Sequence, residues 1–139
     1  MPKMIFVNLP VTHLKKSMAF YTSLGFTNNP VFSDETAACM VWSEAIYVML
    51  LTHAKWRTFT TRAIPQPTAS EVMLAVSCEN REAVDALNTA AAANGGVSDA
   101  NPIQDLGFMY SRDFTDLDGH VWEAVWMDPS AIPQDHQPG

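Results

Sequence analysis

The sequence has little of several features that define whole classes of protein. Only two of its 139 residues are cysteine, and Cys39 and Cys78 lie in unrelated apolar stretches without a CxxC spacing. A disulfide scaffold is therefore excluded, and we predict two buried thiols in a reducing cytoplasm. The longest apolar run, residues 45–51, is much shorter than the roughly 20 residues of a membrane-spanning helix. The first residues lead into a strand-like pattern without a signal-peptide cleavage site, which also favours the cytoplasm.

Basic residues are few as well, since eight Lys and Arg face 15 Asp and Glu and give a formal net charge of −7. Nucleic acids and anionic membranes are bound through clustered basic side chains, so neither is expected as a partner. A small molecule, a cationic ligand or another protein remains compatible with this charge. Hydrophobic residues make up 47% of the chain, which is enough for a folded core and excludes a disordered chain.

Hydrophobic periodicity divides the first half of the chain into five elements. Residues 5–11 alternate between two faces, which predicts a strand. Apolar residues then recur at helical spacing from Leu14 to Leu24, and Gly25 is typical of the end of a helix. Three strand-like stretches follow, at residues 26–32, 36–42 and 45–51. The predicted order is therefore βαβββ.

The second half repeats this order. Residues 72–77 predict a strand, Asn80 is suited to cap a helix, and Gly95 and Gly96 end it. Three further strands are predicted at residues 97–104, 107–114 and 120–127. Two such units offset by about 65 to 70 residues indicate an internal duplication. We therefore expect one domain, residues 1–139, divided into repeat one (4–52), a connection (53–69), repeat two (70–127) and a proline-containing tail (128–139).

Two motifs in these repeats resemble the vicinal oxygen chelate superfamily, which includes glyoxalase I, extradiol dioxygenases, fosfomycin-resistance transferases and bleomycin-resistance proteins. The motif around the first predicted helix reads Val11-x-x-Leu14-x-x-Ser17-x-x-Phe20-Tyr21-x-x-Leu24-Gly25-Phe26. The motif of the last predicted hairpin reads Phe114-x-Asp116-x-Asp118-Gly119-x-x-x-Glu123. One departure is His13, which stands where the superfamily usually has an Asp at the start of the helix, and we predict that Thr12 caps the helix instead.

The resemblance implies an α+β fold. In it, two βαβββ repeats form a curled mixed sheet with a concave cavity, and the helices pack on the outer face. It also implies a homodimer, because most relatives bury an otherwise exposed strand edge by pairing two copies. It does not fix the chemistry, since the same scaffold carries several activities.

The metal site of the superfamily's enzymes is incomplete in this sequence. Such a site takes His, Glu or Gln ligands from the first and last strands of each repeat, and the last-strand position of repeat two is Glu123. The other positions fall on Phe6, near Met49, and on Glu71 or Val72. Glu71 and Glu123 alone are fewer ligands than the three that a catalytic site usually has. We therefore expect no cofactor, with a divalent metal disfavoured.

Glu123 interrupts an otherwise apolar strand, and the resemblance implies that it faces the cavity. Desolvation there is expected to raise its pKa. It is a candidate general base, or an anchor for a cationic or hydroxyl-bearing ligand; the alternative is a relic held by a neighbouring Tyr or Arg.

The other candidate ligand-binding residues are mostly aromatic or apolar: Phe6, Trp42, Tyr47, Met49, His53, Tyr110 and Arg112. Arg112 has two possible partners, Glu123 or a ligand anion on one side and the nearby Asp113 or Asp116 on the other.

These residues leave two functions open. The first is a protein that binds a small organic molecule in an apolar, aromatic cavity without a complete metal site. The second is a divergent glyoxalase-like lyase or isomerase that uses Glu123 as general base or as a residual metal ligand. A cavity filled by its own side chains is a third possibility. The connection holds Lys55, Arg57 and Arg62 without any acid, and it is either a solvated linker or a lid over the cavity.

Overall fold

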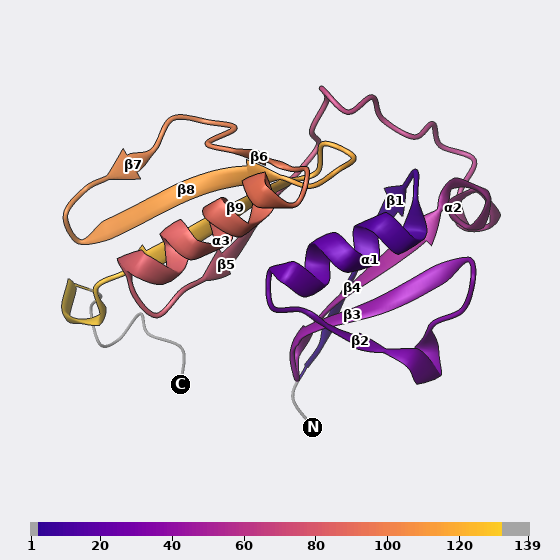
Figure 1. Cartoon of the computed structure of the whole chain (residues 1–139), viewed down its shortest axis with the longest axis horizontal. Coiled ribbons are helices and arrows are strands. Elements are labelled where there is room, and N and C mark those ends of the chain that lie inside the picture. The colour runs from indigo at the N-terminus through magenta and orange to yellow at the C-terminus, as the bar shows by residue number, and fades with distance from the viewer. Residues whose placement is uncertain (1–2, 132–139) are drawn as a thin grey trace.

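The computed structural model of the chain describes residues 3–131 (Figure 1). The predicted tail therefore lies outside the described residues from residue 132 onward. Repeat one consists of β1 (Ile5–Val11), α1 (Leu14–Ser23), β2 (Thr27–Asn29), a 3-10 turn η1 (Pro30–Phe32), β3 (Ala37–Ser43) and β4 (Ile46–Thr52). Its four strands lie in the order β1-β4-β3-β2, with β1 parallel to β4 and the other pairs antiparallel.

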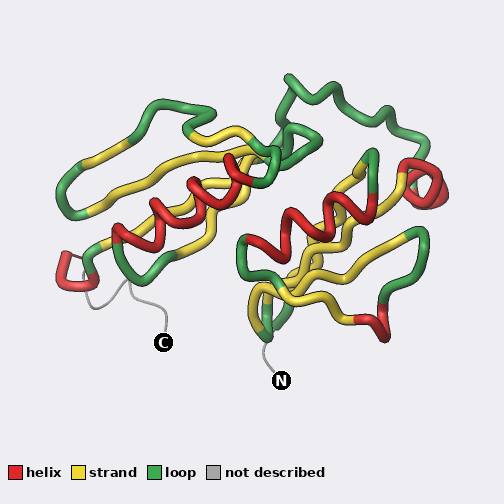
Figure 2. The backbone as a smooth tube through the Cα atoms, viewed as in Figure 1, coloured by secondary structure: helices red, strands yellow, loops and turns green. Residues whose placement is uncertain are grey.

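Repeat two has the same plan. It consists of β5 (Met73–Ser77), α3 (Arg81–Ala93), β6 (Val97–Ser98), β7 (Gln104–Asp105), β8 (Met109–Thr115) and β9 (Val121–Met127), followed by a 3-10 turn η2 (Pro129–Ala131). Its sheet has the order β5-β9-β8-β6, with β7 also paired to β8 and β5 parallel to β9. The predicted α+β fold with mixed strand pairing is thereby confirmed, although the hydrogen bonds divide the strands between two sheets (Figure 2).

Three predicted elements differ from those observed. The strand predicted at 26–32 ends at Asn29, because the Asn29 side chain accepts a hydrogen bond from the Val31 N–H and begins the turn η1. The strand predicted at 97–104 is broken into β6 and β7, and Asp99 between them has φ 53°. The connection contains a short helix, α2 (His53–Phe59), whose first turn is capped by the Thr52 hydroxyl accepting from the Lys55 N–H.

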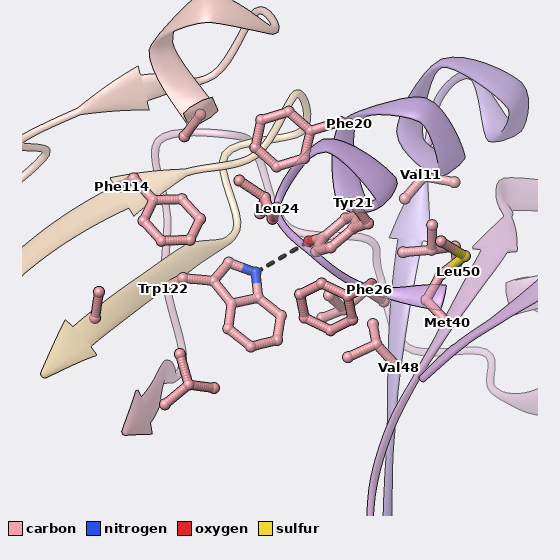
Figure 3. Close-up of a cluster of buried hydrophobic side chains, with 14 of the residues drawn as sticks. Val11, Phe20, Tyr21, Leu24, Phe26, Met40, Val48, Leu50, Phe114 and Trp122 are labelled. Carbon is pink, nitrogen blue, oxygen red and sulfur yellow. Dashed lines mark hydrogen bonds between the residues drawn. The ribbon is translucent and has the colours of Figure 1, made fainter. Parts of the chain in front are cut away.

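The hydrophobic core lies between the helices and the sheets. α1 packs on β3 and β4, and α3 packs on β8 and β9. Tyr21 of α1 and Trp122 of β9 meet at the centre, where the Trp122 indole N–H donates to the Tyr21 hydroxyl at 3.0 Å (Figure 3). The core therefore continues from one repeat into the other. Of the two predicted buried thiols, Cys39 is buried and Cys78 is half-buried, and both are free.

Hydrogen bonds from the β8–β9 hairpin connect repeat two to the segment before α1. The Asp118 carboxylate accepts from both the backbone N–H and the hydroxyl of Thr12, at 2.9 and 2.6 Å. His120 Nε2 lies 2.8 Å from the Pro10 carbonyl oxygen. The prediction that Thr12 caps α1 is therefore wrong: the N-cap residue is His13, which makes no side-chain cap, and the Thr12 side chain is used between the repeats.

Candidate functional site

Each sheet has one face against its helix and one face turned away from it, which we call the open face. In repeat one the strand register places Phe6 beside Tyr47 and Asn8 beside Met49 on the open face. Val48 and Leu50, which alternate with these residues along β4, are fully buried on the helix side. The register therefore places three of the predicted ligand-binding residues, Phe6, Tyr47 and Met49, on one face.

The open face of repeat one carries an aromatic pair. The rings of Phe6 and Tyr47 are stacked, with centroids 4.7 Å apart and an interplanar angle of 13°. The Tyr47 hydroxyl donates to the Glu44 carbonyl oxygen at 2.9 Å, which fixes the ring. Phe6 remains 52% exposed, so its ring offers an apolar surface to a further molecule.

The open face of repeat two carries a pair of carboxylates. The register aligns Ala75, Glu123 and Asp113 on adjacent strands. Asp113 is buried, and one of its oxygens accepts a hydrogen bond from the Asn101 side chain at 2.7 Å. The Glu123 carboxylate makes no hydrogen bond or ion pair with any residue in the described part of the chain. Burial, and then repulsion from Asp113, raise the pKa of Glu123 above its usual value.

Tyr110 and Arg112 lie on the opposite side of the same sheet. Arg112 makes hydrogen bonds to Asp85 of α3 at 2.9 Å and to both oxygens of Asp99 at 2.9 and 2.8 Å. The Tyr110 hydroxyl also donates to Asp85, at 2.6 Å. The predicted pairing of Arg112 with Glu123, and the alternative with Asp113 or Asp116, are therefore wrong. Every second residue of β8 faces α3, and Arg112 is one of them. On that side it reaches the carboxylates of Asp85 in α3 and of Asp99 in the loop after β6.

The ion pairs of Arg112 with Asp85 and Asp99 make the free energy of unfolding decrease at acid pH. Hydrogen bonds from Tyr110 and then Arg112 lower the pKa of Asp85, and Arg112 lowers that of Asp99. A lowered pKa stabilises the folded chain above the unfolded value near pH 4, and the contribution is lost as the pH falls through the folded value. Arg112→Met should therefore reduce the free energy of unfolding by about 1 kcal/mol at pH 7, since water screens the half-exposed carboxylates.

Urea denaturation of both proteins between pH 7 and pH 2 measures this effect. The difference between wild type and Arg112→Met should shrink below pH 4. A difference that stays constant down to pH 2 would show that the guanidinium acts through packing alone. Arg81→Met, which breaks the more exposed pair with Asp105, is the matched control and should have the smaller effect at pH 7.

The remaining predicted site residues lie at the edge of the core, in the connection and just before β5. Trp42 packs against Phe26, with ring centroids 4.8 Å apart, and belongs to the periphery of the core, so it is not directed to the open face. His53 begins α2 and lines a cavity of about 260 Å³ beside the hairpin. Glu71 is exposed and precedes β5 by two residues.

The residues on the open faces do not fit the superfamily's metal centre. The strand partner of Glu123 is Ala75, and the corresponding pair in repeat one is Asn8 with Met49. These four side chains include one carboxylate and a thioether, which is a poor ligand for hard metal ions. Within residues 3–131, no group of three or more His, Cys, Asp or Glu could hold a metal ion. Glu71, the other candidate ligand, is not in register with Glu123.

Three cavities lie instead along the connection, the first where it meets the edges of the two sheets, the second beside the hairpin and the third within the connection itself. The first, about 290 Å³, is lined by residues of β1 and β5 together with Trp56, Arg62, Glu71 and His120. Phe6, Met49 and Glu123 line none of the three. The sequence pattern placed Arg62 in a segment that is either a linker or a lid and did not single out Trp56; the signal for this segment was its basic charge without acids.

Comparisons with known proteins agree with this architecture. A family model described as bleomycin resistance protein-like N-terminal matches residues 3–43. Among solved structures, a hypothetical protein, SA1046, from S. aureus is 25% identical with a TM-score of 0.76, and the match covers 91% of this chain and 94% of that one. A glyoxalase/bleomycin resistance protein/dioxygenase family enzyme from Burkholderia phytofirmans PsJN is 16% identical with a TM-score of 0.74, covering 91% and 99%. No curated protein sequence matches the chain.

A fosfomycin resistance protein, FosX, from Listeria monocytogenes has the same fold at 17% identity, with a TM-score of 0.63 and 91% of each chain covered. These matches define an α+β protein of two βαβββ repeats. They confirm the resemblance of the sequence motifs to the vicinal oxygen chelate superfamily, of the glyoxalase and bleomycin-resistance type. Within the described residues, no helix is long and apolar enough to cross a membrane.

Proposed function

We propose that the protein binds a small organic molecule on its open faces, without the superfamily's metal ion, and that the ligand is cationic or carries a hydroxyl group. The observation that carries this proposal is Glu123. Its carboxylate is half-buried, has no partner among residues 3–131, and stands beside a second acid, Asp113. A carboxylate kept in such a place weakens the fold unless a ligand compensates it.

The aromatic pair supports the same function. Phe6 and Tyr47 supply a flat apolar surface on the open face of repeat one, and Glu123 supplies a negative charge on the open face of repeat two; a planar cation would stack on the first or pair with the second. The net charge of −7 would attract such a ligand from solution. The donor set of Asn8, Met49, Ala75 and Glu123 supports binding without a metal.

We also propose that the functional form is a cytoplasmic homodimer. β1 and β5 are outer strands of their sheets, so each leaves one row of backbone groups unpaired. Large apolar side chains also lie exposed at these two edges, at Ile5 of β1, at Met73 of β5 and at Val72 just before β5. A second copy pairing with these edges would bury both the backbone groups and the side chains.

Ile5→Asp should therefore shift the protein from dimer to monomer in light scattering at micromolar concentration, because a buried carboxylate at a subunit edge costs several kcal/mol. Val31→Asp is the matched control, since Val31 is 81% exposed and lies on η1 away from both edges. A wild-type protein that is monomeric at this concentration contradicts the dimer.

Glu123→Gln tests the binding function. We expect the variant to bind metal-free bleomycin, a cationic compound, about tenfold more weakly, since it loses one charge-assisted contact. We also expect it to be more stable than wild type at pH 7.5. The raised pKa means that ionisation of Glu123 opposes folding; this cost is absent below the unfolded pKa near 4 and grows as the pH rises through the folded value.

Calorimetric titration and thermal denaturation at pH 4 and pH 7.5 measure the two effects. Glu35→Gln, on an exposed turn, removes the same charge and should change neither. Fosfomycin, an anionic ligand, should not bind at this site. If neither bleomycin nor any member of a panel of planar cations binds wild type, or if Glu123→Gln binds them unchanged, the proposal is wrong.

The raised pKa of Glu123 also favours a second candidate, a glyoxalase-like lyase or isomerase in which this carboxylate removes a proton next to a carbonyl group. Exchange of such a proton into deuterated water, catalysed by wild type and not by Glu123→Gln, would support the enzyme. Binding of cations without any exchange would support sequestration.

A further inference from the structure

The connection between the repeats builds a site of its own. Figure 2 shows it arching from α2 to β5 across the ends of both sheets. Its residues line all three cavities, of about 290, 260 and 480 Å³. Arg62 and Thr60 line the first and the third, and Arg57 lines the second and the third. The two arginines therefore stand around a common space.

The charges of Arg57 and Arg62 are not compensated. Neither guanidinium makes an ion pair or a side-chain hydrogen bond to any residue between 3 and 131, whereas Arg81 and Arg112 are both bound to aspartates. The cavity that Arg57 and Arg62 share is lined otherwise by Thr60, Thr61, Ala63 and Ile64, with no acid. In a chain with 15 acids and eight bases, two adjacent arginines without a carboxylate form an isolated positive patch.

The acids of the neighbouring cavities do not neutralise this patch. Asp118 accepts two hydrogen bonds from Thr12 and is engaged there. Glu71 belongs to the segment before β5, which forms one wall of the first cavity. It makes no ion pair with Arg62. An anion would therefore be placed toward Arg57 and the threonines, with the rest of the molecule in the first cavity.

The patch is held by local structure. The Thr60 backbone N–H donates to the Trp56 carbonyl at the end of α2, and the Arg62 N–H donates to the Thr60 hydroxyl oxygen at 3.1 Å. Farther along, the backbone of Pro67 lies directly against Gly119 of the hairpin. A segment that is fixed at both ends loses less conformational entropy when it binds a ligand.

The first cavity offers an apolar wall for the rest of such a ligand. Leu9, Pro10, Pro65 and Leu74 lie around it together with Trp56. The indole N–H of Trp56 is buried and has no hydrogen-bond partner in the described part of the chain. A buried donor without an acceptor is unfavourable, so the indole is suited to a ligand oxygen that approaches it.

From these features we infer a second binding site, which lies at the connection and does not include Phe6, Met49 or Glu123, although Asn8 of the open face lines its first cavity. It takes a small organic oxyanion, a carboxylate or a phosphate ester carrying a compact apolar group. Arg57 and Arg62 hold the oxyanion, since a guanidinium matches two oxygens of a carboxylate or phosphate. The apolar group enters the first cavity beside Trp56. This site requires the opposite ligand charge from the one proposed for Glu123, so either proposal can fail without the other.

Titration with phenyl phosphate, benzoate, inorganic phosphate and neutral benzyl alcohol tests the inference. We expect saturable binding of phenyl phosphate, of benzoate or of both, and the stronger of the two identifies the oxyanion. The double variant Arg57→Gln/Arg62→Gln should weaken that binding at least tenfold. Lys15→Gln/Lys16→Gln changes the net charge equally on the exposed side of α1 and should leave the affinity within twofold.

Limited trypsin digestion gives an independent measurement on the wild-type protein. The bonds after Arg57 and Arg62 should be cleaved more slowly when the bound oxyanion is present, and cleavage after Lys15 should not change. The inference is overturned if no oxyanion binds, if the lysine variant loses as much affinity as the arginine variant, or if benzyl alcohol binds as tightly as the anions. Equal affinity for inorganic phosphate and phenyl phosphate would contradict the use of the first cavity.

Discussion

Asp116→Ala is expected to destabilise the folded chain by about 4 kcal/mol, because it leaves three hydrogen-bond donors without an acceptor. One Asp116 oxygen accepts from the backbone N–H groups of Asp118 and His120, at 3.0 and 2.9 Å. The other accepts from the Tyr21 hydroxyl at 2.5 Å. Asp116 is 4% exposed, so water cannot replace these bonds without opening the contact between the repeats.

Urea denaturation at pH 7 measures the loss, and Asp116→Asn is the control. The asparagine keeps an oxygen for the two backbone N–H groups and should cost clearly less than the alanine. Tyr21→Phe removes the hydroxyl that links Asp116 to Trp122, so the double variant should lose less than the sum of the single variants. Additive losses would mean that the tyrosine and the aspartate do not act together.

Gly119→Ala is expected to cost about 3 kcal/mol and to displace the connection. Gly119 has φ +84°, a conformation that costs an alanine about 1–2 kcal/mol. A Cβ there would also lie 2.1 Å from the Pro67 carbonyl oxygen, a backbone atom that cannot rotate away. The connection must therefore shift, and the cavities that it lines must change shape.

Gly107→Ala separates the two contributions. Gly107 has φ +83°, and a Cβ at that position meets nothing within 4 Å, so the variant should lose only the conformational part. Thermal denaturation gives the stability of both variants, and trypsin cleavage after Arg62 reports the displacement. Cleavage should become faster in Gly119→Ala and stay unchanged in Gly107→Ala. Equal behaviour of the two variants would show that the contact with Pro67 is unimportant.

Much of the fold could be predicted because its signals are local. The alternation of β1 predicted a strand with the bounds that the structure has, and the two βαβββ repeats followed from periodicity and from glycines at the helix ends. The assignment of alternate residues to the two faces of each strand could be predicted too, since side chains along a strand alternate with period two. The strand predicted at 26–32 ends early, at Asn29, because the Asn29 side chain accepts a hydrogen bond from the backbone N–H of Val31 and starts a turn.

Less of the candidate site could be predicted, because its partners come from distant parts of the chain. Alternation puts Glu123 on the face opposite Trp122, but only the register shows that its neighbours are Ala75 and Asp113. Arg112 was a candidate for the same cavity, and only the position of α3 decides that it binds Asp85. A salt bridge between residues 27 positions apart leaves no local pattern in a sequence.

By itself, the sequence determined the repeated order of strands and helices and the acidic charge of the chain, and it showed that the superfamily's metal ligands are largely missing. Composition and periodicity carry the repeated order and the charge without regard to long-range contacts, whereas the missing ligands follow from the resemblance of the motifs to the superfamily. Only the tertiary structure decided that Asp116 and Asp118 join the two repeats, and that the basic connection is held against the hairpin at Gly119. These contacts depend on how the two sheets are packed, which brings residues about a hundred positions apart to hydrogen-bonding distance.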